Sequence, residues 1–287
     1  MQFKGIITPM ITPVKKGKID DESTKMLIDF LLKSGNEGIF VATTTGGFTL
    51  FSFEEHNKIL KIARDNYPNS RIFLSGISRN NLEETLRMGK LAVDYGSDGA
   101  VIIMPYYLKF GQDAIFNYYA EIAESLEIPL FVYNYPDLSG NEIYPETLEK
   151  LMTQYSNIVG LKDSSGDMIK FNRFMRHMPI HSYIFQGRDD LLYESICLGA
   201  SGGVCGISNF STIIHNLYVS KDISYHKKIT LLTEKLKNFN NQVSYNYLFR
   251  KLVLKEENPL DYAMKPFHDL NEKQVKEVQE VINVINQ

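Results

Sequence analysis

One lysine stands at the end of an apolar run, where burial can change the chemistry of its amine. The run is Ile158-Val159-Gly160-Leu161, and Lys162 follows it directly. Burial penalises an ammonium ion, so the pKa of such a lysine falls and a neutral, nucleophilic amine becomes available. That amine can form a Schiff base with a ketone. The alternative is an ordinary lysine at a strand end, whose head group reaches solvent.

A tyrosine and a pair of threonines occupy comparable positions. Tyr133 follows Leu130-Phe131-Val132, and a phenol beside a Schiff base can carry protons to and from a substrate hydroxyl. Thr44 and Thr45 precede Gly46-Gly47, where consecutive backbone N–H groups and two hydroxyls could hold a carboxylate. The alternatives are a core aromatic residue with a satisfied hydroxyl and a turn that satisfies only its own backbone.

Two other polar patterns could indicate a phosphate site or a metal site, but neither is favoured. Residues 199–203 suggest a phosphate loop, but they precede a strand-like run, which favours a helix end leading into a tight turn. His177 and His181 are four residues apart, and Pro179 between them prevents one helical face. Because no metal-binding motif is present, we expect neither a metal nor a cofactor. An iminium on Lys162 would then serve as the electron sink.

Short apolar runs alternate with segments of helical period, and this alternation predicts the fold. The runs are apolar throughout, as in parallel strands buried on both faces. They fall at 3–7, 38–42, 71–75, 100–104, 129–133, 158–162, 183–186 and 203–205. The expected helices fall at 21–34, 52–66, 80–95, 112–125, 145–154, 168–177, 189–198 and 210–219. Eight such units predict an α/β protein, a (β/α)8 TIM barrel.

A doubly wound open sheet is the structural alternative, but the first strand is not followed by the glycine-rich turn of that fold. Beyond residue 222 only helical segments follow, at 225–239, 244–253 and 272–286, with the charged stretch 251–257 expected as a solvated loop. We therefore expect a catalytic barrel over 1–222 and a C-terminal helical extension over 223–287. Chemistry in a barrel lies at the C-terminal strand ends, where Lys162, Tyr133, Thr44 and Thr45 are all placed.

The composition excludes several classes of function. Lys and Arg total 31 against 34 Asp and Glu, with no long basic run, which argues against nucleic acid as a partner. No stretch approaches the roughly 20 apolar residues of a membrane span. The N-terminus lacks the apolar core of a secretory signal, and the two cysteines form no CxxC motif. A cytoplasmic location is therefore expected.

The chain resembles the dihydrodipicolinate synthase and N-acetylneuraminate lyase family of class I aldolases. The resemblance covers nearly the whole chain to about residue 220 and becomes looser beyond. Its motifs, each at a strand end, are Ile6-Ile7-Thr8-Pro9, Thr44-Thr45-Gly46, Pro105-Tyr106-Tyr107, Tyr133-Asn134-Tyr135-Pro136 and Gly160-Leu161-Lys162-Asp163-Ser164-Ser165-Gly166-Asp167.

The resemblance implies a role for each candidate. Lys162 is similar to the Schiff-base lysine, Tyr133 to the general acid/base, and Thr44 and Thr45 to the carboxylate binders. Tyr107 is similar to a tyrosine lent across a subunit interface, in a homotetramer built as a dimer of dimers. The candidate catalytic residues are thus Lys162, Tyr133, Tyr107 and Thr45, and the candidate substrate-binding residues are Thr44, Thr45, Gly187, Asp189, Cys205 and Ser164.

Departures from the family pattern narrow the expected substrate. Leu138 stands where the synthase has an arginine, and Gly47 stands where the synthase and the lyase have glutamate. Residues 187–192 and 199–206 resemble the archaeal 2-keto-3-deoxygluconate aldolases of the Entner–Doudoroff pathway. The expected reaction is reversible cleavage of that sugar acid to pyruvate and glyceraldehyde, with Asp189 at a distal hydroxyl. Dihydrodipicolinate synthase, N-acetylneuraminate lyase and a catalytically silent sugar-acid-binding barrel remain as alternatives, and acceptance of a 6-phosphate stays open.

Overall fold

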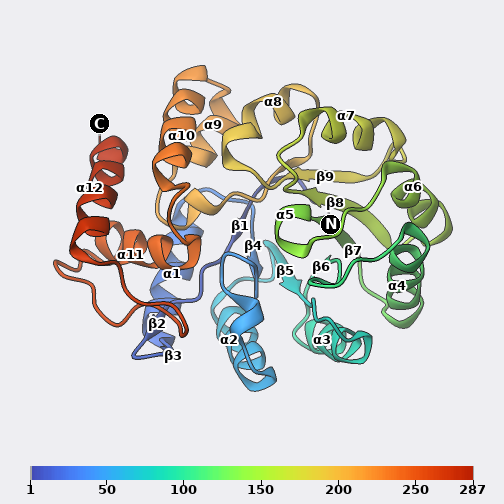
Figure 1. Ribbon diagram of the computed structural model, residues 1–287, viewed down its shortest axis with the longest axis horizontal. Helices are drawn as coiled ribbons and strands as arrows, with labels where there is room; N and C mark the ends of the chain where they lie inside the picture. Colours follow the sequence, from blue (N-terminus) through green and yellow to red (C-terminus); the bar gives the residue numbers. More distant parts are fainter. Residues whose placement is uncertain (1, 287) are drawn as a thin grey trace.

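The computed structural model describes residues 2–286 and contains a closed barrel of eight parallel strands. Figure 1 shows these strands as a ring with helices around it, which confirms the predicted (β/α)8 TIM barrel. The strand order is β1-β10-β9-β8-β7-β6-β5-β4. The strands are β1 (Gly5–Pro9), β4 (Gly38–Val41), β5 (Ile72–Gly76), β6 (Gly99–Ile103), β7 (Leu130–Asn134), β8 (Ile158–Asp163), β9 (Tyr183–Gln186) and β10 (Gly202–Gly203).

The helices between the strands follow the predicted segments closely. Several begin at a side chain that accepts a hydrogen bond from the first turn, such as Ser52, which forms a capping box with Glu55 before α2. Their apolar faces pack on the barrel. They are α1 (Asp21–Lys33), α2 (Phe53–Asn66), α3 (Leu82–Asp94), α4 (Gln112–Ser125), α6 (Pro145–Gln154), α7 (Met168–His177), α8 (Leu192–Cys197) and α9 (Ile213–Ser220).

Two predicted helices are wrong in their first turns. The segment 189–198 divides into the 3-10 helix η2 (Asp189–Leu191) and α8, and the helix expected at 210–219 begins only at Ile213, as α9, after the short 3-10 helix η3 (Gly206–Asn209). The Asp189 carboxylate connects the two altered segments, because its oxygens accept hydrogen bonds from the Gly206 N–H at 2.9 Å and the Ile207 N–H at 2.7 Å. One side chain thus joins the turns that follow β9 and β10.

Three short elements were not predicted, one of which is the 3-10 helix η1 (Phe48–Leu50) after β4. The hairpin of β2 (Val14–Lys15) and β3 (Lys18–Ile19) turns through Lys16 and Gly17, both with positive φ, as in a tight two-residue turn. Its strands are too short for an alternating pattern. The helix α5 (Pro136–Ser139) is a single turn that begins at a proline and ends at Gly140 in the left-handed region.

The C-terminal extension consists of α10 (Ile223–Leu236), α11 (Asn241–Leu252) and α12 (Glu272–Asn286). It lies beside the barrel in Figure 1, and its buried side chains belong to the same hydrophobic core as those of β1 and β4. Residues 242–250 of α11 are buried without interruption, so this helix is covered on all sides. The loop predicted at 251–257 begins later, because α11 continues to Leu252. No helix among residues 2–286 is long and apolar enough to cross a membrane.

Arg250 fixes the far end of α11 to the start of the barrel. Its side chain is only 2 % exposed. One guanidinium nitrogen donates to the Val14 carbonyl at 2.8 Å and to Asp20 Oδ2 at 3.2 Å, and the other donates to Glu256 Oε1 at 2.7 Å. Since Asp20 also caps α1, one buried cation links the extension, the β2–β3 hairpin and the first barrel helix.

We predict that Arg250→Met lowers the free energy of unfolding by about 3 kcal/mol, because it leaves two carboxylates without their buried partner. Urea unfolding would measure the change. Arg173→Met is the matched control, since it breaks an ion pair of similar length to Glu146 on the exposed surface and should cost under about 1 kcal/mol. Equal losses in the two variants would contradict the role of Arg250.

Candidate active site

Lys162 lies near the carboxyl end of β8 and points into the barrel. Its side chain is 5 % exposed, and Nζ lies 3.9 Å from the centroid of the Tyr133 ring and 5.4 Å from that of Phe40. It forms no ion pair with any residue of 2–286. Burial lowers the pKa of the amine to about 7, although Cys205 and Asp189 oppose the shift. A large fraction of the amine is therefore neutral at physiological pH.

Tyr133 is the neighbour of Lys162 on the adjacent strand. The two residues are paired in the register of β7 and β8, so their side chains project to the same side of the sheet. Burial raises the pKa of the phenol to about 12, and the nearby hydroxyls of Ser164 and Thr44 act against this shift. Tyr133 therefore stays protonated at neutral pH and can donate a hydrogen bond or a proton to a bound molecule.

The hydroxyls of Thr44 and Ser164 are buried and have no hydrogen-bond partner among the described residues. Buried polar atoms are rarely left unpaired in folded proteins, because each costs about 1–3 kcal/mol. Both hydroxyls lie close enough to the Tyr133 phenol to lower its pKa, so the three groups lie together. The two hydroxyls and the phenol can therefore bind one polar group together.

The Thr44–Thr45 turn follows β4 and is held from behind. Thr43 Oγ1 donates to the Met10 carbonyl at 3.1 Å and accepts from the Gly46 N–H at 2.9 Å, and Gly47 N–H donates to the Thr44 carbonyl at 3.0 Å. Within residues 2–286 the N–H groups of Thr44 and Thr45 donate to no protein atom. Two such donors beside a hydroxyl can bind a carboxylate.

The backbone is strained at Ala42, two residues before Thr44, where this turn begins. Ala42 has a φ of 57°, in the left-handed region that costs a residue with a side chain about 1 kcal/mol. Its carbonyl oxygen would lie 2.2 Å from a Cβ added at Gly76, so β5 must end in glycine to admit it. The left-handed Ala42 thus turns the chain sharply across the mouth of the barrel.

Gly187 makes room for the lysine. A Cβ at this position would lie 2.0 Å from Ser164 Oγ and 3.1 Å from Lys162 Cε. Asp163, the next residue along β8, faces the other way and accepts hydrogen bonds at 2.8 Å from Asn134 Nδ2 and Ser165 Oγ. The candidate residues Lys162, Tyr133, Thr44, Ser164 and Gly187 therefore surround one space at the carboxyl ends of the strands.

Asp189 and Cys205 lie close to this space, but their contacts in the structure are with the protein itself. Burial raises the pKa of Asp189 to about 6, with the Ile207 and Gly206 N–H groups opposing it. Both carboxylate oxygens already accept these backbone hydrogen bonds, so the side chain stabilises the start of η3. Cys205 is completely buried beside it. The contact of Asp189 with a distal substrate hydroxyl stays a prediction.

Tyr107 is 90 % exposed, and its φ of 81° is unusual for a tyrosine. Its backbone N–H donates to the Ser139 carbonyl at 3.2 Å, which joins the loop after β6 to α5. Leu138 in α5 is likewise exposed. In this single chain both side chains face solvent and neither lies in the space around Lys162.

Two side chains of the extension reach the same region and were missed by the sequence analysis. A Cβ at Gly47 would lie 2.6 Å from Gln242 Nε2, so only glycine at position 47 leaves room for this side chain of α11. Tyr245 lies one turn further along α11 and packs over Gly206. Their spacing in the sequence indicates only a helical face, which hides any role beyond packing.

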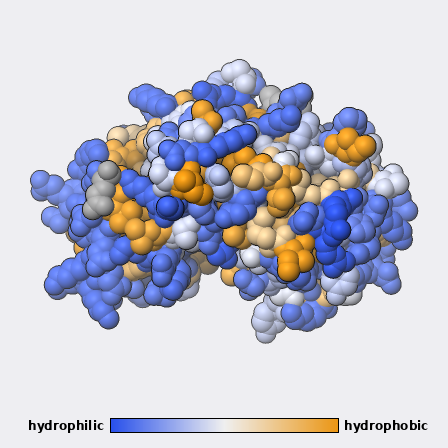
Figure 2. Space-filling view, turned by 90° about the horizontal axis from the view of Figure 1, so that it is seen from above, coloured by the Kyte–Doolittle hydropathy of each residue, from blue (hydrophilic) through white to orange (hydrophobic). Residues whose placement is uncertain are grey.

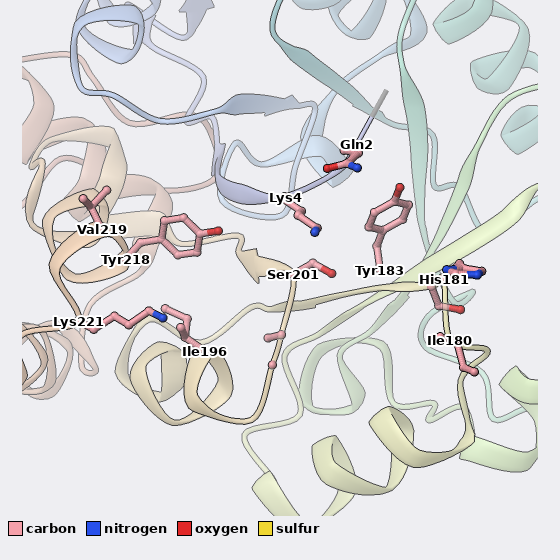
Figure 3. Close-up of a pocket in the computed structure, with 13 residues that line it drawn as sticks. Gln2, Lys4, Ile180, His181, Tyr183, Ile196, Ser201, Tyr218, Val219 and Lys221 are labelled. Carbon is pink, nitrogen blue, oxygen red and sulfur yellow. The ribbon is translucent and has the colours of Figure 1, made fainter.

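A large hollow lies at the opposite end of the barrel. Figure 3 shows its lining, which includes Lys4 before β1 and Tyr183 at the first position of β9, together with His181 and Lys221. These positions belong to the amino ends of the strands, where barrels do not carry their chemistry. It contains none of the candidate catalytic residues.

A buried lysine of lowered pKa beside a phenol, at the carboxyl ends of eight parallel strands, defines the class of barrel lyases and aldolases that bind carbonyl substrates. Within that class, the chain belongs to the dihydrodipicolinate synthetase family, whose model matches residues 2–285. Members of this family are lyases and aldolases that use pyruvate, and this chain is one of these pyruvate-dependent enzymes.

Individual relatives represent two activities. The chain is 39 % identical to a 2-dehydro-3-deoxy-D-gluconate/2-dehydro-3-deoxy-phosphogluconate aldolase of Picrophilus torridus, over 73 % of this chain and 78 % of the relative. It is 31 % identical to a 4-hydroxy-tetrahydrodipicolinate synthase of Syntrophobacter fumaroxidans, over 79 % of each. The solved 2-keto 3-deoxygluconate aldolase from Picrophilus torridus superposes with a TM-score of 0.88 at 34 % identity, covering 94 % of this chain and 99 % of that one.

We predict that Lys162 reacts with an amine-selective reagent whose own reactivity does not change with pH, such as acetic anhydride, with a midpoint near pH 7. Its lowered pKa leaves a neutral amine above that pH, so labelling should rise between about pH 6 and 8 and then level off. Mass spectrometry of peptides would follow each lysine. Lys61 is the control, because Asp65 raises its pKa and delays its reaction to strongly alkaline pH. A common profile for both lysines would contradict the lowered pKa.

Proposed function

We propose that this enzyme is a class I aldolase that cleaves 2-keto-3-deoxygluconate reversibly to pyruvate and glyceraldehyde. The observation that carries the proposal is the desolvated amine of Lys162 in contact with the Tyr133 ring, beside unpaired hydroxyls of Thr44 and Ser164. An amine of this kind forms imines with 2-keto acids, and its neighbours can bind the carboxylate and move protons.

The proposed reaction begins when the N–H groups and hydroxyls of Thr44 and Thr45 bind the substrate carboxylate. Lys162 Nζ then attacks C2, and Tyr133 donates its proton to the departing hydroxyl, so that water leaves and an iminium and a phenolate remain. The phenolate accepts the proton of the C4 hydroxyl, the C3–C4 bond breaks, and its electron pair moves into the iminium to form an enamine. Glyceraldehyde leaves. Protonation of C3 and hydrolysis of the imine release pyruvate and restore the free lysine.

Several observations favour a substrate whose tail carries only hydroxyl groups over one whose tail carries a second carboxylate or a phosphate. Leu138, where the synthase pattern has arginine, is apolar and exposed, so it offers no anchor for a second carboxylate. The two cations considered for a 6-phosphate are already engaged. Lys109 Nζ donates to the Gly140 carbonyl, and Arg188 pairs with Asp190 at 3.3 Å. We therefore favour the unphosphorylated substrate.

Lys162→Ala should abolish both carbon–carbon cleavage and the mass gain after borohydride reduction in the presence of pyruvate, because Lys162 is the only buried lysine among residues 2–286. Tyr133→Phe should keep the trapped adduct but lower kcat by about 10²–10⁴-fold, since it removes a proton carrier. Cleavage by the alanine variant would overturn the proposal. A wild-type protein that gains no mass would instead be a sugar-acid-binding barrel without turnover.

The substrate assignment needs a separate comparison. The keto acids derived from gluconate and galactonate, with and without phosphate, would be incubated beside N-acetylneuraminate and beside pyruvate with aspartate semialdehyde. Pyruvate release only from neuraminate, or pyruvate consumption only with the semialdehyde, would replace the proposed substrate.

We also propose that the protein assembles as a homotetramer, because two separate apolar surfaces are exposed. The first surrounds Tyr107 and comprises Tyr107, Leu108, Phe110, Leu138 and Tyr144. The second, on the side of α7, α8 and α10 that faces the reader in Figure 2, comprises Ile169, Leu198 and Ile223 beside a shallow groove. Apolar patches of this kind commonly mark contacts between subunits. At the first surface Tyr107 would reach the partner's site.

Light scattering would test this assembly. We expect a wild-type tetramer, and we expect Leu108→Asp and Ile169→Asp each to yield dimers, because each places a charge in one of the two interfaces. Val93→Asp alters an exposed apolar residue of α3 outside both surfaces and should leave the tetramer intact. A wild-type protein that is monomeric at micromolar concentration would contradict the proposal.

A further inference from the structure

The C-terminal extension brings a phenol to the mouth of the barrel. Tyr245 of α11 is only 7 % exposed, and its ring meets Phe210 edge-on with centroids 5.2 Å apart. Its other face covers Gly206, where an added Cβ would lie 2.5 Å from Cε2 and 3.3 Å from the hydroxyl. The ring therefore fits only because position 206 has no side chain.

The surroundings of the Tyr245 hydroxyl belong to the site and not to the extension. Burial raises its pKa well above the usual value, and the neighbouring Asp189, Cys205 and Tyr135 add to this while Arg188 opposes it. These four residues follow the carboxyl ends of β7, β9 and β10. The hydroxyl forms no hydrogen bond with any residue of 2–286, yet it is not sealed from solvent. It is a neutral donor surrounded by groups that follow the strand ends.

The position of this phenol is fixed by both ends of α11. At its start, Asn240 Oδ1 caps the helix by accepting from the Gln242 N–H at 3.0 Å, and the Gln242 side chain lies against Gly47. Gln242 and Tyr245 are three residues apart and so share one face of the helix. At its end, Arg250 is bonded to Val14 and Asp20. The helix therefore holds Tyr245 in a set relation to the Thr44–Thr45 turn.

Geometry indicates which half of the substrate Tyr245 meets. A substrate joined to Lys162 at C2, with its carboxylate on the Thr44–Thr45 turn, must extend its remaining carbons away from the strand ends. Tyr135 and Arg188 lie beyond the last residues of β7 and β9, and both are close enough to Tyr245 to shift its pKa. We propose that Tyr245 hydrogen-bonds the hydroxyl-bearing aldehyde half of the substrate and so helps the enzyme to select polyhydroxylated chains. This inference rests on the proposed aldolase function.

The test compares Tyr245→Phe, which removes only the hydroxyl and keeps the packing on Phe210 and Gly206, with Tyr247→Phe. Tyr247 is a buried tyrosine of the same helix on a different face, near Tyr262. Two substrates would be used, namely 2-keto-3-deoxygluconate and 4-hydroxy-2-ketopentanoate, which carries a methyl group in place of the hydroxylated tail. Borohydride trapping with pyruvate would be measured for every variant.

We expect Tyr245→Phe to lower kcat/KM for the sugar acid by about 3- to 10-fold, the value of one hydrogen bond, and to leave the methyl substrate and pyruvate trapping unchanged. Tyr247→Phe should change none of the three. Equal losses on both substrates, or no loss on either, would overturn the role of Tyr245 while the trapped adduct still supports the aldolase. Absence of the adduct in the wild-type protein would overturn both proposals.

Discussion

The exclusion of water from a single amine is the constraint on which the rest of the site depends. Lys162 Nζ faces the rings of Tyr133 and Phe40 and has no carboxylate in ion-pair contact among the described residues, so the nearby Asp189 and Cys205 offset only part of the cost of burying its charged form. The barrel provides this environment because β7 and β8 bring Lys162 and Tyr133 level, and because Gly187 leaves the lysine room. A lysine paired with an acid at the same place would keep its proton and its charge.

The extension completes a mouth that the barrel leaves open. The last strand, β10, has only two residues, and the chain that follows it turns at once into η3. Asp189 fixes that turn through two backbone hydrogen bonds, and α11 covers it with Tyr245. Loops above a barrel are usually variable, whereas here a buried helix tied to the core by Arg250 forms one wall. The fold thus gives this wall the rigidity of the barrel itself.

The sequence predicts the barrel well because strands buried on both faces have a continuous apolar pattern that few other structures share. It also places Lys162, Tyr133 and Thr44 at strand ends, which the register of β7 with β8 bears out for the first two. It could not predict that Asp189 divides a helix, since that depends on a contact with Gly206 and Ile207, far along the chain. Nor could it separate Tyr245 from the other aromatic residues of α11, because helical spacing does not reveal which side chain meets a cavity.

The energetic cost of the desolvated amine also affects how this protein can evolve. A lysine held below its usual pKa is a thermodynamic burden on the native state, since the unfolded chain binds the proton more readily between pH 7 and about 10.5. An apolar side chain of similar length at that position would relieve it. A single substitution would therefore silence the chemistry and strengthen the scaffold together. One stabilising substitution is therefore enough to give a protein that still binds keto acids but no longer converts them. Selection for turnover is what retains the reactive lysine.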